Sequence, residues 1–222
     1  HHLLRRQRQM CIRDRFLTTN GSSMSWTSVS SENIQSMQVW TGNGTWNRPS
    51  GVTYIHVRLN GGGGGGAGHG ESGGAGGYSE RVMSVANISS VGITIGGGGG
   101  GTWYFNRGGD GGSSSFGPYM SAGGGHGAAR NNSHSGGLGR NGSGGDINIW
   151  GGGGQSHAAH GGGTGGPSHF GGSVAAGWPN GGNFSHNHQD HSAYGSGGSG
   201  GHFGSFRGSN GKYGVVTVIN YK

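Results

Sequence analysis

Aromatic and imidazole side chains occupy almost every gap between the glycine runs in the second half of this chain. Aromatic rings give a large contact area at a low cost in side-chain entropy, and they are favoured at interfaces. Surrounded by Gly, Asn and Ser, they have the composition of an antibody paratope. We therefore predict that these residues bind a receptor: Trp103, Tyr104, Phe105, Phe116, Tyr119, Trp150, His169, Phe170, Trp178, Phe184, Tyr194, Phe203 and Phe206. The alternative is that they cap the glycine layers as a minimal core, and we expect half or more of them to do so.

A histidine cluster lies within residues 184–191, where His186, His188 and His191 follow Phe184. Imidazoles at such spacing are able to bind zinc or nickel if the loop converges. The H-x-H pair also resembles the iron-binding motifs of trimeric fibre tips, although Phe184 stands where those motifs have glycine. The other interpretation is a solvated polar loop. We adopt it, predict no metal, and count the three histidines among the receptor-binding residues.

The sequence contains no arrangement that predicts catalysis. It has no G-x-S-x-G motif, and its acidic residues lie far apart. G-x-G-x-x-G matches arise trivially in glycine runs, and no strand–glycine–helix unit supports them. The R-G-G sequence occurs once, at Arg107, without an RNA-recognition signature. We therefore expect a non-enzymatic protein with no cofactor and no nucleic-acid partner.

The basic charge of the chain comes largely from its first residues. The formal net charge is +7, from 14 Lys and Arg against 7 Asp and Glu. Residues 5–15 resemble a translated sequencing adapter; the other interpretation is a basic arm for nucleic acid or membrane. Without this segment, nine basic and six acidic residues remain, so the argument for a polyanionic partner disappears. The segment also holds the only cysteine, Cys11, so disulfides are not expected. No apolar stretch is long enough to span a bilayer, so no membrane insertion is expected.

The local patterns predict strands joined by turns and glycine runs. We expect residues 1–15 to be an adapter-derived, disordered artefact, residues 16–36 a linker, and residues 37–222 one glycine-rich domain. Alternating or β-branched segments predict strands, and T-G-N-G at residues 41–44 predicts a turn. The expected strands are residues 37–40, 52–59, 78–85, 91–95 and 214–221.

Glycine, with 61 of the 222 residues, is far above its usual share of about 7%. A glycine run is able to adopt the extended polyproline II helix, and several such helices are able to pack closely because glycine has no side chain. Ordering each residue costs about 1–2 kcal/mol, whereas a backbone hydrogen bond contributes about 0.5–1.5 kcal/mol. A lone run would therefore stay disordered, but runs clamped by strands would fold. We predict an all-β fold in which β-sandwich-like strands clamp stacked polyglycine II helices, with long irregular loops.

Several motifs, in order along the chain, resemble the glycine-rich domain of bacteriophage tail fibre and receptor-binding adhesin proteins. Residues 40–52 contain G-T-W-x-x-P-x-G-V, and a strand then leads into glycines 61–66. Further matches are V-x-I-x-I followed by glycines in residues 91–101, G-G-S-S-S-F-G at 111–117, and the closing strand at 211–221. The resemblance implies a β-rich sandwich enclosing polyglycine helices, with receptor-reading loops at a distal end.

The resemblance implies an adhesin domain that recognises a bacterial surface protein or glycan through the loops between glycine runs. Other tail-fibre subunits would be further partners, and the location would be the virion tail-fibre tip or the extracellular space. Two alternatives stay open from the residues. One is a structural glycine-rich extracellular or cell-wall protein. The other is an ice-binding polyglycine bundle. Such a protein needs a flat face of regularly repeated small residues or threonines, but Thr102 and Thr164 are the only threonines between residues 97 and 211.

Overall fold

A computed structural model describes residues 15–19, 24–28, 34–68, 70–103, 106–129, 137–155, 162–173, 193–201 and 207–222. All regular elements within these residues are β-strands. The predicted all-β class is therefore confirmed.

Two five-stranded antiparallel sheets form the base of the molecule. In spatial order, the first sheet consists of β10 (Gly142–Ser143), β9 (Met120–Ala122), β8 (Ser114–Phe116), β7 (Ser90–Thr94) and β4 (Gly44–Asn47). The second consists of β11 (Ile147–Ile149), β6 (Tyr78–Ser84), β5 (Tyr54–Asn60), β12 (Val215–Tyr221) and β3 (Ile34–Trp40).

The apolar core contains side chains from both sheets. Ile55, Val57 and Leu59 alternate along β5 and are fully buried, as a strand with one face on the core requires. Trp46 of β4 is also fully buried, and its indole Nε1 donates to Asn220 Oδ1 of β12 at 3.0 Å. This bond between the sheets satisfies the one polar atom of the indole, so the ring is buried without an unpaired donor.

Each of the five predicted strands is present, with shifts of a few residues at the ends. The predicted turn at 41–44 is one residue too long, because β4 begins at Gly44. The short strands β4 and β8 to β11 were not predicted, because each has only two to four residues, too few to show an alternating pattern. The segment 16–36, predicted to be a linker, includes strands. It contains most of a hairpin of β1 (Arg15–Thr19) and β2 (Met24–Ser28), and β3 begins at Ile34. Its Thr, Phe and Trp residues favour strands despite the high serine content.

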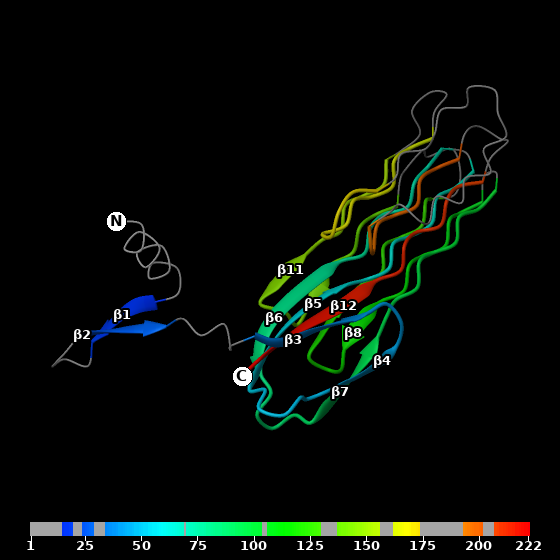
Figure 1. The fold of residues 1–222 in the computed structure, drawn as a ribbon. Helices are drawn as coiled ribbons and strands as arrows, with labels where there is room; N and C mark the ends of the chain where they lie inside the picture. The colour runs from blue at the N-terminus through cyan, green and yellow to red at the C-terminus, as the bar shows by residue number, and fades with distance from the viewer. Residues whose placement is uncertain are drawn as a thin grey trace, which may run out of the picture.

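Strands of both sheets continue into glycine-rich runs that extend away from the sandwich as one elongated bundle (Figure 1). The C-terminus lies at the sandwich end (Figure 1). In the described part of the chain these runs comprise residues 61–67, 71–77, 96–102, 108–112, 123–128, 137–141, 151–155, 162–167, 196–201 and 208–214.

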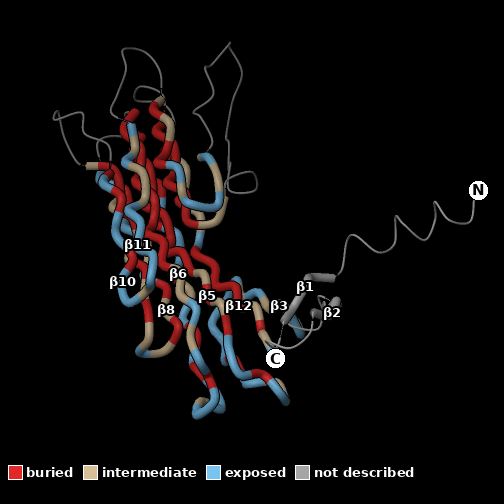
Figure 2. The backbone as a smooth tube through the Cα atoms, turned by 90° about the vertical axis from the view of Figure 1, so that its left-hand side faces the viewer, coloured by how far each residue is buried: buried red, intermediate tan, exposed pale blue. Residues whose placement is uncertain are grey.

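The run 61–67 lies at the centre of the bundle, and all of its residues are buried (Figure 2). Its hydrogen-bond partner changes at each residue and returns after three. The Gly61 and Gly64 amides donate to run 71–77, at 2.9 Å in both cases. The Gly62 and Gly65 amides donate to run 108–112, and the Gly63 and Gly66 amides donate to run 208–214. This period of three equals the number of residues per turn in a polyproline II helix.

Six runs surround this central run, since runs 96–102, 123–128 and 196–201 donate to its carbonyl groups. The six also bond to one another in a closed ring. Run 71–77 has six bonded neighbours as well, because runs 137–141, 151–155 and 162–167 form an outer layer on its far side. The backbone polar groups of the bundle are thus paired between runs rather than within a helix or a sheet.

Close backbone contact explains why the runs consist of glycine. A Cβ placed on Gly65 would lie 2.2 Å from the Gly100 carbonyl oxygen, and one on Gly62 would lie 2.1 Å from that of Gly97. Gly97 and Gly100 themselves face outward, and a Cβ there would meet nothing within 4 Å. Glycine is therefore required where a residue faces a neighbouring run and is not required where it faces solvent.

We predict that Gly65→Ala destabilises the protein by about 3 kcal/mol or more, since the added methyl group must displace backbone. Gly100→Ala is the matched control. It should be neutral or stabilise by about 0.4–1 kcal/mol, because it restricts only the unfolded chain. Urea denaturation of both variants measures the difference, and equal stabilities would contradict the close packing.

Candidate functional site

Phe116 and Tyr119 belong to the hydrophobic core and its margin. Phe116 is fully buried, with its ring centroid 6.1 Å from that of Trp46. Tyr119 is partly buried, packs against the same core, and lies 6.4 Å from Phe116 between ring centroids. The prediction that Phe116 contacts a receptor was wrong. Its aromatic ring is one of the few large apolar groups available to fill the sandwich.

Two predicted tryptophans are exposed at separate places. Trp103 follows the run 96–102 at the end of the bundle remote from the sandwich, and 53% of its surface is exposed. Trp150 follows β11 on the flank of the bundle, and 66% of its surface is exposed. These two residues have the accessibility that receptor contact requires, but they do not form one patch.

Three other predicted residues pack beside Tyr78, the first residue of β6, or beside Tyr213, which precedes β12. His169 stacks on Tyr78 with 3.6 Å between ring centroids, and Phe170 contacts the same tyrosine edge-on at 5.8 Å. Tyr194 is half-buried against Tyr213 at 5.5 Å. His169 and Phe170 remain exposed, but all three close over the junction between sandwich and bundle.

The other predicted site residues lie outside the described residues. They are Tyr104, Phe105, Trp178, Phe184, His186, His188, His191, Phe203 and Phe206. Within the ranges that the structure describes, no group of three or more His, Cys, Asp or Glu side chains is placed to hold a metal ion.

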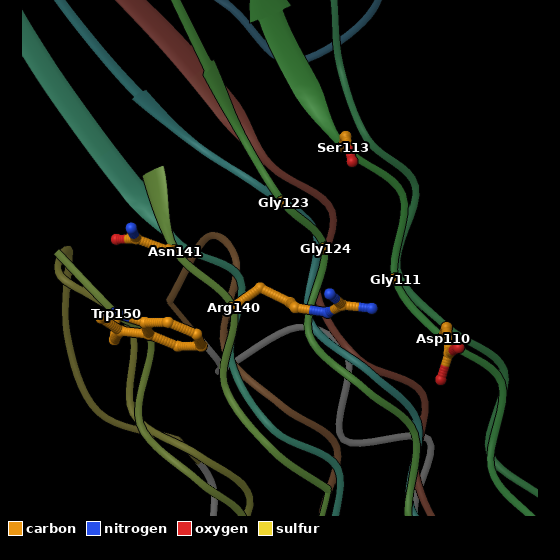
Figure 3. A pocket seen from close by; sticks show the side chains of 8 residues that line it. All are labelled: Asp110, Gly111, Ser113, Gly123, Gly124, Arg140, Asn141 and Trp150. Atoms are coloured by element: carbon orange, nitrogen blue, oxygen red, sulfur yellow. The ribbon is translucent and has the colours of Figure 1, made fainter. Parts of the chain in front are cut away.

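A groove of about 370 Å³ runs along the flank of the bundle, beside Trp150. Its floor is the backbone of Gly123 and Gly124, and its walls carry Asp110 and Arg140 (Figure 3). Gly111, Ser113, Asn141 and Trp150 complete the lining. The volume falls within the range of about 300–1,000 Å³ that is usual for ligand sites.

The arginine and the tryptophan are arranged around one glycine-rich run. The Arg140 side chain extends across the floor toward the run that bears Gly111 and Asp110 (Figure 3). A Cβ on Gly123 would lie 3.1 Å from Arg140 Cβ, so a glycine at this position leaves room for the arginine stem. The Trp150 ring lies on the other side of the Arg140 backbone (Figure 3).

The carboxylate on the opposite wall is held in its ionised form. Asp110 Oδ1 accepts from the Gly127 amide at 2.8 Å and from Arg107 Nη2 at 2.7 Å, and His126 Nδ1 lies 3.5 Å away. Partial burial opposes ionisation, but these partners outweigh it and hold the pKa of Asp110 below its usual range. The groove thus has a fixed hydrogen-bond acceptor on one wall.

The guanidinium on the other wall has no such partner among the residues that the structure describes. No side-chain hydrogen bond or ion pair joins Arg140 to another described residue. Arg140 is exposed, and its planar group has five N–H donors available to a ligand.

Sequence reasoning found only Trp150 of this groove. Asp110, Ser113, Arg140 and Asn141 come from segments far apart in the chain, and hydrogen bonding between runs brings them together. The available signal was that each is a polar residue flanking a glycine run.

A second polar cluster, also not predicted, lies on the outer face of the second sheet. Glu80 Oε1 is 2.5 Å from His56 Nε2 and 3.4 Å from Arg58 Nε. The Tyr78 hydroxyl donates to Glu80 Oε2 at 2.5 Å. Burial opposes ionisation, but these three partners outweigh it and lower the pKa of Glu80, while burial and the bond to Glu80 raise the pKa of Tyr78. Because His169 stacks on Tyr78, the cluster anchors the 168–171 turn to the sheet.

Comparison with protein families matches residues 38–221 to a model described as "Glycine-rich domain". The chain belongs to the glycine-rich domain family. The matched residues include both sheets and the runs between them, so the family describes the sandwich and bundle together. A comparison with curated proteins gives no match to this glycine-rich domain. Among the described residues, no helix has the length and apolar character needed to cross a bilayer.

We predict that Glu80→Gln lowers the free energy of unfolding by about 1–2 kcal/mol at pH 7, since charge-assisted hydrogen bonds are lost. Because the folded pKa of Glu80 is lowered, its contribution is complete above the unfolded value of about 4.3. It is lost as the pH falls through the folded pKa. Urea denaturation between pH 7 and pH 3 should show the two proteins converging, and a constant difference would contradict the assignment.

Proposed function

We propose that this glycine-rich domain is a recognition module of the phage tail-fibre adhesin type, which binds a bacterial surface protein or glycan. Its place would be the tail-fibre tip of a virion or another extracellular surface. The ordered motifs that resemble tail-fibre adhesins support this proposal, and the family match supports the coarser identity as a glycine-rich domain.

The observation that carries the proposal is the arrangement of the run ends. The outgoing runs end close to one another. The Thr102, Ala128 and Gly201 amides donate to carbonyl groups of residues 65–67 in the central run, and the Gln155 carbonyl accepts from the Ser72 amide. The connections between outgoing and returning runs therefore begin at a common end, as the binding loops of a rigid scaffold do.

Trp103 is the described aromatic residue at this end. The Thr102 hydroxyl donates to the Asn106 carbonyl at 2.7 Å, and the Asn106 amide donates to the Trp103 carbonyl at 3.3 Å. These bonds tighten the backbone on both sides of the tryptophan. An exposed ring beside hydrogen-bonded backbone supplies contact area with little further loss of entropy, which is typical of binding hot spots.

We predict that the fluorescently labelled domain binds saturably to at least one strain in a diverse bacterial panel. Trp103→Ala should weaken this binding about tenfold or more, because hot-spot tryptophans carry a large share of the binding energy. Tyr54→Ala is the matched control, since Tyr54 is also 53% exposed but lies on the second sheet. Titration by flow cytometry measures both variants. Absence of saturable binding to every strain would contradict the function, and unchanged binding by Trp103→Ala would contradict the role of the distal end.

A further inference from the structure

We infer that the groove beside Trp150 binds a linear oligosaccharide that carries a carboxylate, and that Arg140 recognises this carboxylate. The inference rests on the proposed function, because it names the chemistry of a bacterial surface ligand.

The carboxylate is inferred from the guanidinium of Arg140, which pairs with no acidic side chain in the described part of the chain. Arg140 projects into the groove, and no described acidic side chain neutralises it. Arginine presents a planar pair of N–H donors that matches the two oxygens of a carboxylate. Two parallel hydrogen bonds fix the orientation of the carboxylate as well as attracting it, so a carboxylated ligand would bind at one position along the groove.

Asp110 determines which anion fits. Its carboxylate is ionised on the opposite wall, where Arg107 already pairs with it at 2.7 Å. A doubly charged phosphate would be repelled by this carboxylate, whereas the singly charged carboxylate of a sugar ring bound at Arg140 leaves the neutral hydroxyl groups of the same ring to face Asp110. Asp110 accepts hydrogen bonds from hydroxyls, and Asn141 and Ser113 both donate and accept. This set of polar groups suits a polyhydroxylated ligand.

Trp150 supplies the apolar part of the site. Two thirds of its surface is exposed, although removing this large apolar ring from water would be favourable. The C–H face of a sugar ring is flat and weakly apolar, so it packs on an indole while its hydroxyls remain hydrogen-bonded. Because the indole and the Arg140 guanidinium lie on opposite sides of run 137–141, one ligand reaches both only if it is elongated (Figure 3).

The floor of the groove is glycine backbone. Gly123 and Gly124 have no side chains, so the Arg140 side chain is able to cross them, and a chain of sugar rings is able to lie against its guanidinium. A Cβ on Gly124 would lie 2.0 Å from the Gly111 carbonyl oxygen, so the packing of the bundle itself keeps this position free of a side chain.

The test is isothermal titration calorimetry of the intact chain with trigalacturonic acid, and with galactotriose as the neutral comparison. We expect saturable binding of trigalacturonic acid that weakens as salt is raised, and binding of galactotriose at least tenfold weaker. Arg140→Gln and Trp150→Ala should each weaken binding of the acidic trisaccharide at least tenfold. Arg81→Gln is the matched control, because Arg81 is a cation outside the groove whose Nη1 donates to the Gly144 carbonyl at 3.3 Å. Circular dichroism melting confirms that each variant is folded.

Three results would overturn the inference: no binding of trigalacturonic acid to the folded chain, equal binding of galactotriose, or binding that neither Arg140→Gln nor Trp150→Ala weakens. The labelled variants, tested on the bacterial panel, separate this inference from the proposed function. If the parent chain binds cells and Arg140→Gln binds them equally well, the groove inference fails while the adhesin function stands. If trigalacturonic acid binds but no strain does, the adhesin function fails.

Discussion

The fold depends on backbone groups of neighbouring runs approaching so closely that no Cβ fits between them. At Gly62 and Gly65 the neighbouring carbonyl oxygens occupy the place of a side chain. This contact allows amides to bond to three different neighbours in turn, and it replaces the apolar core that the bundle lacks. Each backbone hydrogen bond contributes only about 0.5–1.5 kcal/mol, against about 1–2 kcal/mol for ordering a residue. The sandwich supplies the remaining stabilisation, because its buried strands fix where the runs begin and end.

The same constraint determines where chemistry is possible. The interior of the bundle holds few side chains, and most of these are small ones such as Ala75 and Ser72, so larger functional groups gather on its flank and at its ends. The flank groove follows from this exclusion: two glycines form the floor, while Asp110 and Arg140 project from the neighbouring runs. Recognition residues can therefore change at the surface without disturbing the packing, provided that the inward-facing glycines remain.

The sequence was sufficient to predict the all-β class, five strands of the sandwich (β3, β5, β6, β7 and β12) and the role of glycine as a packing element. Alternating apolar residues such as Ile55, Val57 and Leu59 carry that information locally. The short strands escaped prediction because sequences such as Gly142–Ser143 have no apolar alternation, and their pairing depends on neighbours. The groove escaped prediction for a related reason. Arg140 and Asp110 meet only through the order of the runs in the bundle, and the two glycine-rich segments that bear them look alike in sequence. Phe116 was predicted to be exposed and is buried. Glycine-rich neighbours in the sequence do not indicate whether an isolated aromatic residue lies in the core or at the surface.

The most direct test of the packing is amide hydrogen exchange resolved by residue. The Gly61, Gly62, Gly64 and Gly65 amides bond to neighbouring runs and are buried, so we expect protection comparable to that of the β5 and β12 strands. The Gly97 and Gly100 amides face outward and bond to no described acceptor, so they should exchange much faster than Gly99, which donates to Gly63 at 2.8 Å. Uniformly fast exchange through residues 61–66, at the rate of an unstructured chain, would contradict a bundle held together by its backbone.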